Sequence, residues 1–165
     1  MKIGLISDTH GHLEASVADY FEHCDEIWHA GDIGEGRIIE SLSEIAPVMA
    51  VYGNIDTPAF QKLYPEDILL EREGKRILMT HIGGKPPRYN PRVKRQIKEL
   101  QPDIFICGHS HILRVIPDKM NNCLYINPGA AGKQGFHRVK TIIRFDINAG
   151  KIENMEVIEL GKRGY

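Results

Sequence analysis

Five short apolar segments of this chain end, one after another, in side chains that can bind a metal ion. The segments finish in the letters SDTHG, AGDIG, YGNID, MTHIGG and CGHSH, all between residues 7 and 111. Short apolar runs with β-branched residues that stop at such polar clusters predict buried strands. Because ligands of α/β proteins gather beyond the carboxyl ends of strands, these sequence-distant side chains are expected to meet.

The bulk composition narrows the class of protein. A length of 165 residues with 42% hydrophobic and 26% charged residues fits one domain spanning 1–165. A formal charge of −1 gives no reason to expect stable nucleic-acid binding. No apolar run approaches the ~20 residues that cross a bilayer, so no membrane partner is expected. Three scattered cysteines without CxxC spacing favour a reducing compartment, with the cytoplasm as the default location.

Helical and extended patterns alternate early in the chain, and extended patterns dominate later. Helices are predicted over 13–23, 36–46 and 92–101. Strands are predicted over 2–7, 26–31, 48–53, 103–108, 113–117 and 124–129, with hairpins over 67–81 and 141–160. This order favours an α/β fold in which a β-sandwich of two mixed sheets is flanked by helices. A single doubly wound sheet is the alternative.

Seven side chains after the five segments are candidate metal ligands, namely Asp8, His10, Asp32, Asn54, His81, His109 and His111. Two pairs have i, i+2 spacing, which places both members on one side of an extended segment. Seven donors exceed the four of a tetrahedral ion, so two ions that share one carboxylate fit better. Asp32 lies between the flanking sets and is the natural bridge. Imidazole, carboxylate and amide donors without thiolate favour Mn, Fe, Ni or Zn over Mg.

The charge of such a centre indicates its chemistry. Two divalent ions contribute +4 and two aspartates contribute −2, which leaves a net charge of +2 that attracts a phosphate anion. Divalent ions lower the pKa of bound water from ~15.7 towards ~7, so hydroxide forms near neutral pH. The residues therefore predict phosphoester hydrolysis.

The ordered blocks D-x-H, G-D, G-N, H and G-H-x-H resemble the calcineurin-like metallophosphoesterase superfamily. The short chain is similar to the small bacterial and archaeal phosphodiesterase branch. The resemblance implies a two-sheet sandwich and two divalent ions, with Mn first and Ni, Fe or Zn as alternatives. It implies one ion held by Asp8, His10, Asp32 and His111, and another held by Asp32, Asn54, His81 and His109. Catalysis is then expected from Asp32, Asn54 and His109 through metal and phosphate positioning.

One position departs from the family pattern. Many members carry His directly after the Asn, where this chain has Ile55, which cannot transfer a proton. We therefore expect a preference for esters whose leaving groups need little protonation, such as aryl phosphodiesters. Asp56 is interpreted either as a partner that orients a ligand histidine or as a turn-stabilising residue.

Two further segments carry cations near the expected centre. The loop 85–92 is interpreted as a rigid connector or as a substrate-facing lip in which Lys85 or Arg88 meets a phosphate oxygen. Lys133, His137 and Arg138 are candidates for a similar role.

The main prediction is a metal-dependent phosphoesterase, and most readily a phosphodiesterase, that acts on a small phosphoester substrate. The alternative is a non-catalytic metal-binding scaffold that recruits a protein partner, as the retromer-subunit relative of the family does. The complete donor set favours the enzyme, because a scaffold has no physical need for seven convergent ligands. A structural zinc module would need a closed four-ligand site. By analogy with small family members, the chain is a candidate for homo-oligomer formation.

Overall fold

The computed structural model describes residues 1–164, which form two five-stranded sheets, a two-stranded ribbon and four helices. The first sheet has the order β12–β11–β1–β2–β3, with bounds Lys151–Lys162, Val139–Asn148, Lys2–Ile6, Glu26–His29 and Val48–Ala50. The second has the order β4–β5–β8–β10–β9, with bounds Asp67–Arg72, Lys75–Thr80, Ile104–Ile106, Cys123–Asn127 and Arg114–Asp118.

Both sheets are mixed, which confirms the predicted sandwich over a single doubly wound sheet. In the first sheet β1, β2 and β3 run parallel, while β11 is antiparallel to β1. In the second sheet β5, β8 and β10 run parallel, and β4 and β9 pair with them in the antiparallel sense. The carboxyl ends of six parallel strands therefore define one functional edge, and the chain reverses at the opposite one.

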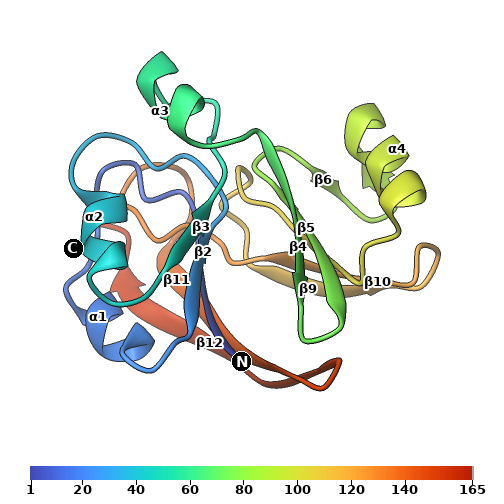
Figure 1. Ribbon diagram of the computed structural model, residues 1–165. Helices are drawn as coiled ribbons and strands as arrows, with labels where there is room; N and C mark the ends of the chain where they lie inside the picture. Colours follow the sequence, from blue (N-terminus) through green and yellow to red (C-terminus); the bar gives the residue numbers. More distant parts are fainter. Residues whose placement is uncertain (165) are drawn as a thin grey trace.

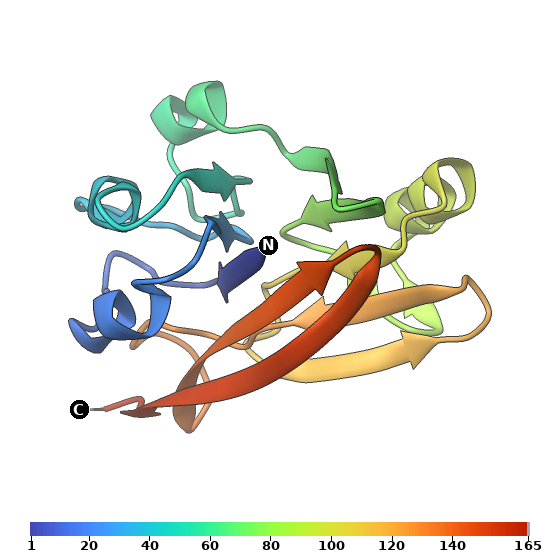
Figure 2. The same cartoon turned by 60° about the horizontal axis from the view of Figure 1, so that its bottom comes forward.

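Helices cover the outer faces of the two sheets. The helices α1 (Ser16–Phe21) and α2 (Ile38–Ser43) lie on the flank of the first sheet, and α4 (Pro91–Leu100) lies on the flank of the second (Figure 1). Figure 2 shows the same separation after rotation, with the two sheets between the helices. The arrangement follows from side-chain burial, because α1 and α2 share a buried cluster with β1 and β2, and α4 shares one with β5 and β8.

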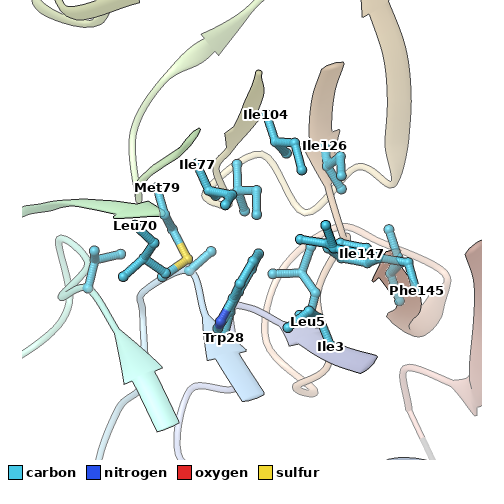
Figure 3. Packing of buried hydrophobic residues seen from close by; sticks show 14 residues of the cluster. Ile3, Leu5, Trp28, Leu70, Ile77, Met79, Ile104, Ile126, Phe145 and Ile147 are labelled. Carbon is cyan, nitrogen blue, oxygen red and sulfur yellow. The ribbon is translucent and has the colours of Figure 1, made fainter. Parts of the chain in front are cut away.

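The main core lies between the sheets, and strand alternation assigns side chains to it. Ile3 and Leu5 of β1 point inward, where they meet Trp28 of β2 and Met79 of β5 (Figure 3). Gly4 points the other way, and a Cβ there would lie 2.8 Å from a ring carbon of Phe21. Glycine thus lets α1 approach the sheet closely.

The helix α4 shows how local sequence sets an element's bounds. Asn90 caps its start, since the Asn90 side chain accepts a hydrogen bond of 2.8 Å from the Val93 backbone N–H. Pro91 occupies the first turn, where a missing N–H costs nothing. The helix ends at Leu100, and Gln101 adopts a left-handed conformation with φ of 46°. The prediction of a helix over 92–101 is confirmed within one residue at each end.

Two elements were not predicted from the sequence. The helix α3 (Pro58–Leu63) has no fully buried residue, and its six residues are too few to show a helical period in the sequence. The loop 85–92 contains most of a ribbon formed by β6 (Gly84–Lys85) and β7 (Arg88–Tyr89). Within the described residues, no helix is long and apolar enough to cross a membrane.

Candidate metal centre

The seven predicted ligands lie in the loops that follow five strands. Asp8 and His10 follow β1, Asp32 follows β2, and Asn54 follows β3 of the first sheet. The remaining three come from the second sheet: His81 directly follows β5, and both His109 and His111 follow β8. Because these strands are parallel within their sheets, the functional edge brings all seven side chains together.

One group of four donors contains both aspartates. The donor atoms of Asp8, His10, Asp32 and His111 all lie within 4.8 Å of one another. The His111 Nε2 atom is 3.1 Å from Asp8 Oδ1, and the His10 Nε2 atom is 3.3 Å from His111 Nε2. Two imidazole nitrogens directed at the same point are typical of ligands around a cation.

A second group shares Asp32 with the first. The donor atoms of Asp32, His81 and His109 lie within 4.8 Å of one another. The Asn54 Oδ1 atom adds a fourth donor, at 3.1 Å from His81 Nε2 and 2.9 Å from His109 Nδ1. Asp32 is thus the one carboxylate common to both groups, in the position that a bridging ligand requires.

Neighbouring backbone and hydroxyl groups orient the donors. The Ala30 carbonyl lies 2.8 Å from His81 Nδ1, so the ring presents Nε2 to the centre. Ser7 donates its hydroxyl hydrogen bond to Asp8 Oδ2 at 2.6 Å, and the Ile55 backbone N–H donates to Asp32 Oδ1 at 3.0 Å. The sequence pattern of single polar residues after a strand did not identify these orienting groups.

The backbone of the centre is unusual. Five of the seven predicted ligands have positive φ: 53° at Asp8, 46° at His10, 52° at Asp32, 66° at His109 and 57° at His111. This left-handed conformation costs a residue with a side chain roughly 1–2 kcal/mol. Such strain concentrates at functional sites, where the surrounding structure maintains it.

Glycines beside the ligands leave no room for a side chain. A Cβ on Gly53 would lie 2.1 Å from Asp32 Oδ1, and a Cβ on Gly108 would lie 2.1 Å from Ser7 Oγ. These contacts are shorter than any real Cβ makes. The glycines that directly precede Asn54 and His109 are therefore required by the close approach of the chain.

Asp56 binds backbone and does not contact a ligand histidine in the described part of the chain. Its carboxylate accepts hydrogen bonds from the N–H groups of Gly53 at 2.7 Å, Ile33 at 3.1 Å and Gly34 at 2.8 Å. Of the two interpretations, turn stabilisation is thus the one that the structure supports. Asp56 joins the loops after β2 and β3, which carry two of the ligands.

Buried charges at the centre stabilise one another. Burial alone raises the pKa of Asp32, but the hydrogen bond and charge of His81, the Ile55 N–H and His10 together outweigh it, so the pKa lies below the usual value. Burial likewise disfavours protonated His81, but the interactions with Asp32 and Asp8 outweigh it and raise the pKa. Asp8 and Asp32 are 0% and 2% exposed. Two buried carboxylates surrounded by imidazoles fit divalent cations, which would replace the protons as counter-charges.

Two of the cavities beside the donors define the surroundings of a bound molecule. One, of about 380 Å³, is lined by His10, Ile55, Thr57 and Gln134, among others. Another, of about 260 Å³, is lined by His109, Lys85 and Arg114, among others. Lys85 therefore lines a cavity that His109 also lines, whereas Arg88 does not belong to the lining of either cavity.

Of Lys133, His137 and Arg138, the second set of cations predicted near the centre, His137 contacts a predicted ligand. His137 lies beside His111, with 3.3 Å between their Nδ1 atoms, and its Nε2 atom is 2.9 Å from the Gly132 carbonyl. The neighbouring Gly135 would place a Cβ 2.0 Å from His111 Nδ1. His137 thus helps to fix the position of the His111 ring.

Comparison with known proteins agrees with this geometry. The model of the calcineurin-like phosphoesterase superfamily domain matches residues 1–150. A relative named "Probable metallophosphoesterase MJ0623" from Methanocaldococcus jannaschii is 36% identical over 137 residues, which cover 79% of this chain and 68% of the relative. A protein of the same organism named "Phosphodiesterase MJ0936" is 26% identical over 78% of this chain and 83% of its own length.

A solved structure shares the fold over nearly the whole chain. Vps29 from Entamoeba histolytica, solved in complex with Zn²⁺, has a TM-score of 0.75 at 18% identity and covers 96% of this chain and 99% of its own. At this identity the likeness concerns the fold alone. The family model and the 36% identical relative carry the assignment of the family. The chain belongs to the calcineurin-like phosphoesterase superfamily.

Proposed function

We propose that this protein is a metal-dependent phosphodiesterase that holds two divalent ions, manganese first among the candidates. The observation that carries the proposal is the convergence of seven donors into two groups that share Asp32. Membership of a phosphoesterase family and the phosphodiesterase name of one relative support the same reaction class.

The predicted ligand residues form two sets, one for each ion. Asp8, His10, Asp32 and His111 would hold one ion, and Asp32, Asn54, His81 and His109 would hold the other. When bound, such ions make a water molecule more acidic and attract the phosphate anion. Asp32 fixes the spacing of the two positions because its two oxygens face different groups: Oδ2 faces His10 at 3.6 Å and Oδ1 faces His81 at 3.2 Å.

The more exposed donors are the ones that would position the substrate. Asn54 and His109 are exposed, whereas Asp8, Asp32 and His81 are buried. Phosphate oxygens would therefore approach from the Asn54 and His109 side, where solvent also enters. The two exposed side chains orient the ester, and the buried ones maintain the charge of the centre.

Ile55 supports the preference for diesters with good leaving groups. The side chain is 43% exposed and lines the 380 Å³ cavity beside His10. An alkyl leaving group at this position would find no proton donor in Ile55, and general acids contribute typically ~10²–10⁴-fold to rate. Ile55→His should therefore raise the rate on alkyl phosphomonoesters, measured with glycerol phosphate. A variant that folds and binds manganese normally but shows no gain would contradict this role.

One observation supports the alternative of a non-catalytic scaffold: several structures with this fold are Vps29 proteins. One of them was solved with Zn²⁺, so metal binding does not separate an enzyme from a protein of the Vps29 kind. The deciding measurement is therefore turnover.

The test compares hydrolysis of bis-p-nitrophenyl phosphate and p-nitrophenyl phosphate by purified protein with added manganese. We expect faster turnover of the diester, together with close to two bound metal ions per chain by elemental analysis. Asp32→Asn should reduce both quantities, and Asn54→Ala should reduce turnover more than metal content. His23→Ala is the matched control, since this histidine side chain is 80% exposed and lies outside the described metal groups. Full activity in both Asp32→Asn and Asn54→Ala would rule out the proposed site.

A further inference from the structure

The cavity on the His109 side of the centre has two basic residues in its wall. It measures about 260 Å³ and is lined by Lys85 of β6, Arg114 of β9, Ser110, Ile112 and His109, together with three glycines and Tyr125. Since His109 belongs both to this lining and to the second donor group, the cavity adjoins the proposed position of the phosphate.

The two basic residues are available to a ligand. In the part of the chain that the structure describes, neither Lys85 nor Arg114 forms an ion pair, and the cavity lining contains no carboxylate. Other cations near the core are neutralised, as Arg72 is by Glu26 at 2.9 Å and Lys75 is by Asp103 at 3.1 Å. Two unpaired cations in one wall favour an anionic ligand.

The floor of the cavity is held in place by a hydrogen bond and by close packing at two glycines. Tyr125 donates a hydrogen bond of 3.0 Å to the Gly84 carbonyl, which fixes the turn that carries Lys85. Gly84 has a φ of 76°, and a Cβ on Gly83 would lie 2.5 Å from the Phe105 ring. Because Gly83 and Gly84 have no side chains, the space next to the backbone at the start of β6 remains open as part of the cavity. The Ile112 side chain, 50% exposed, gives the cavity an apolar wall.

We propose that this cavity binds the second arm of the phosphodiester and that this arm is a ring-sized group carrying its own anionic substituent. The inference rests on the proposed function for the position of the scissile phosphate. A cavity of about 150 Å³ holds a benzene molecule, so 260 Å³ accommodates a ring with a substituent. Ile112 packs against the ring, and Lys85 and Arg114 bind the anionic group.

The test measures binding of two non-hydrolysable compounds that differ only in charge. 4-Carboxybenzylphosphonate and 4-carbamoylbenzylphosphonate have the same shape and the same phosphonate, and calorimetry with the manganese-loaded protein compares them. We expect the carboxylate to bind about five- to tenfold more tightly, the range for a charged hydrogen bond that remains partly exposed. The advantage should fall to about onefold in the Lys85→Gln, Arg114→Gln double variant.

Arg88→Gln is the matched control. Arg88 pairs with Lys85 across the β6–β7 ribbon but does not belong to the cavity lining, so this variant should keep the carboxylate advantage. Equal binding of the two compounds to the wild-type protein would overturn the proposal, as would an advantage that persists in the double variant. Absence of diester hydrolysis together with a retained carboxylate advantage would overturn the proposed function and leave the anion pocket standing.

Discussion

The two edges of the sandwich use the same strained backbone conformation for different purposes. At the functional edge, five non-glycine residues with positive φ are predicted metal ligands. At the opposite edge, positive φ occurs at Glu73, Asn122 and Ala149, which lie in the turns β4–β5, β9–β10 and β11–β12. Two of these turns are neighbours, since a Cβ on Gly150 would lie 3.8 Å from the Glu73 carbonyl oxygen.

The difference is in what the strain achieves. In the turns, the left-handed conformation reverses the direction of the chain over a few residues. At the functional edge it directs a side chain towards a point that the strand direction alone would not reach. The same substitution, to glycine, should therefore have opposite consequences at the two edges.

The largest effect is expected for His109→Gly. Glycine adopts the φ of 66° at this position without strain but removes a predicted ligand. We expect the rate of bis-p-nitrophenyl phosphate hydrolysis to fall by about a hundredfold or more, since even groups that only support a ligand typically cost 10–100-fold. The measurement is kcat with saturating manganese, and near-normal kcat would show that the imidazole does not act in the reaction.

Removal of metal ions should lower the free energy of unfolding, because the predicted ions bind the folded chain at the functional edge. Ions that bind the folded chain at 100 times their dissociation constant add about 2.7 kcal/mol per site, and 1 kcal/mol shifts Tm by roughly 2–4 °C for a chain of this size. For the two proposed sites together, we expect a chelator to lower Tm by about 10–20 °C in calorimetry.

Asp32→Asn provides the matching control for the chelator experiment. This variant lacks the carboxylate shared by both groups, so its Tm should respond far less to the chelator. A wild-type protein with identical Tm in manganese and in chelator would contradict the coupling between ions and fold.

A smaller effect is expected for Asp67→Asn, near the functional edge. Burial raises the pKa of Asp67, but hydrogen bonds from Arg92 and other neighbours outweigh it, so the pKa lies below the usual value. A carboxyl with a lowered folded-state pKa stabilises the protein above the unfolded pKa of ~3.9 and loses this contribution as pH falls. The variant should lose about 1 kcal/mol at pH 7, and the difference should shrink towards pH 3. Urea unfolding at several pH values measures it, and a pH-independent difference would exclude the charge as its cause.

The smallest effect is expected for Glu73→Gly at the opposite edge. Relief of the left-handed strain, about 1–2 kcal/mol, exceeds the extra entropy that glycine gives the unfolded chain, about 0.4–1 kcal/mol. We expect a gain of about 0.5 kcal/mol in unfolding free energy with unchanged kcat. A loss of activity here would remove the contrast between the two edges.

The sequence was sufficient to predict the strands that precede the predicted ligands. Each is a short apolar run that ends at a glycine or a polar residue, and both the β4–β5 hairpin at Glu73-Gly74 and the convergence of seven donors follow from that pattern. It was insufficient where burial is low. The helix α3 has six residues, none of them fully buried, and β6 and β7 contribute two residues each to a ribbon in a Pro-rich loop.

The groups that surround the predicted ligands could not be predicted from the sequence. The Ala30 carbonyl that orients His81 lies 51 residues away from it, and Arg114 reaches its cavity only through the pairing of β9 with β10. Such contacts depend on how the two sheets are ordered. A pattern read along the chain identifies which residues have the right chemistry, whereas only the topology determines their neighbours.

The pairing of β11 with β1 has a consequence for how the protein is made. A ribosome delivers Lys2–Ile6 long before Val139–Asn148, the strand that covers its side opposite β2. Until then, one row of backbone N–H and C=O groups on β1 stays open to pairing with other chains. We therefore expect the nascent chain to be prone to aggregation until the C-terminal hairpin has closed the sheet.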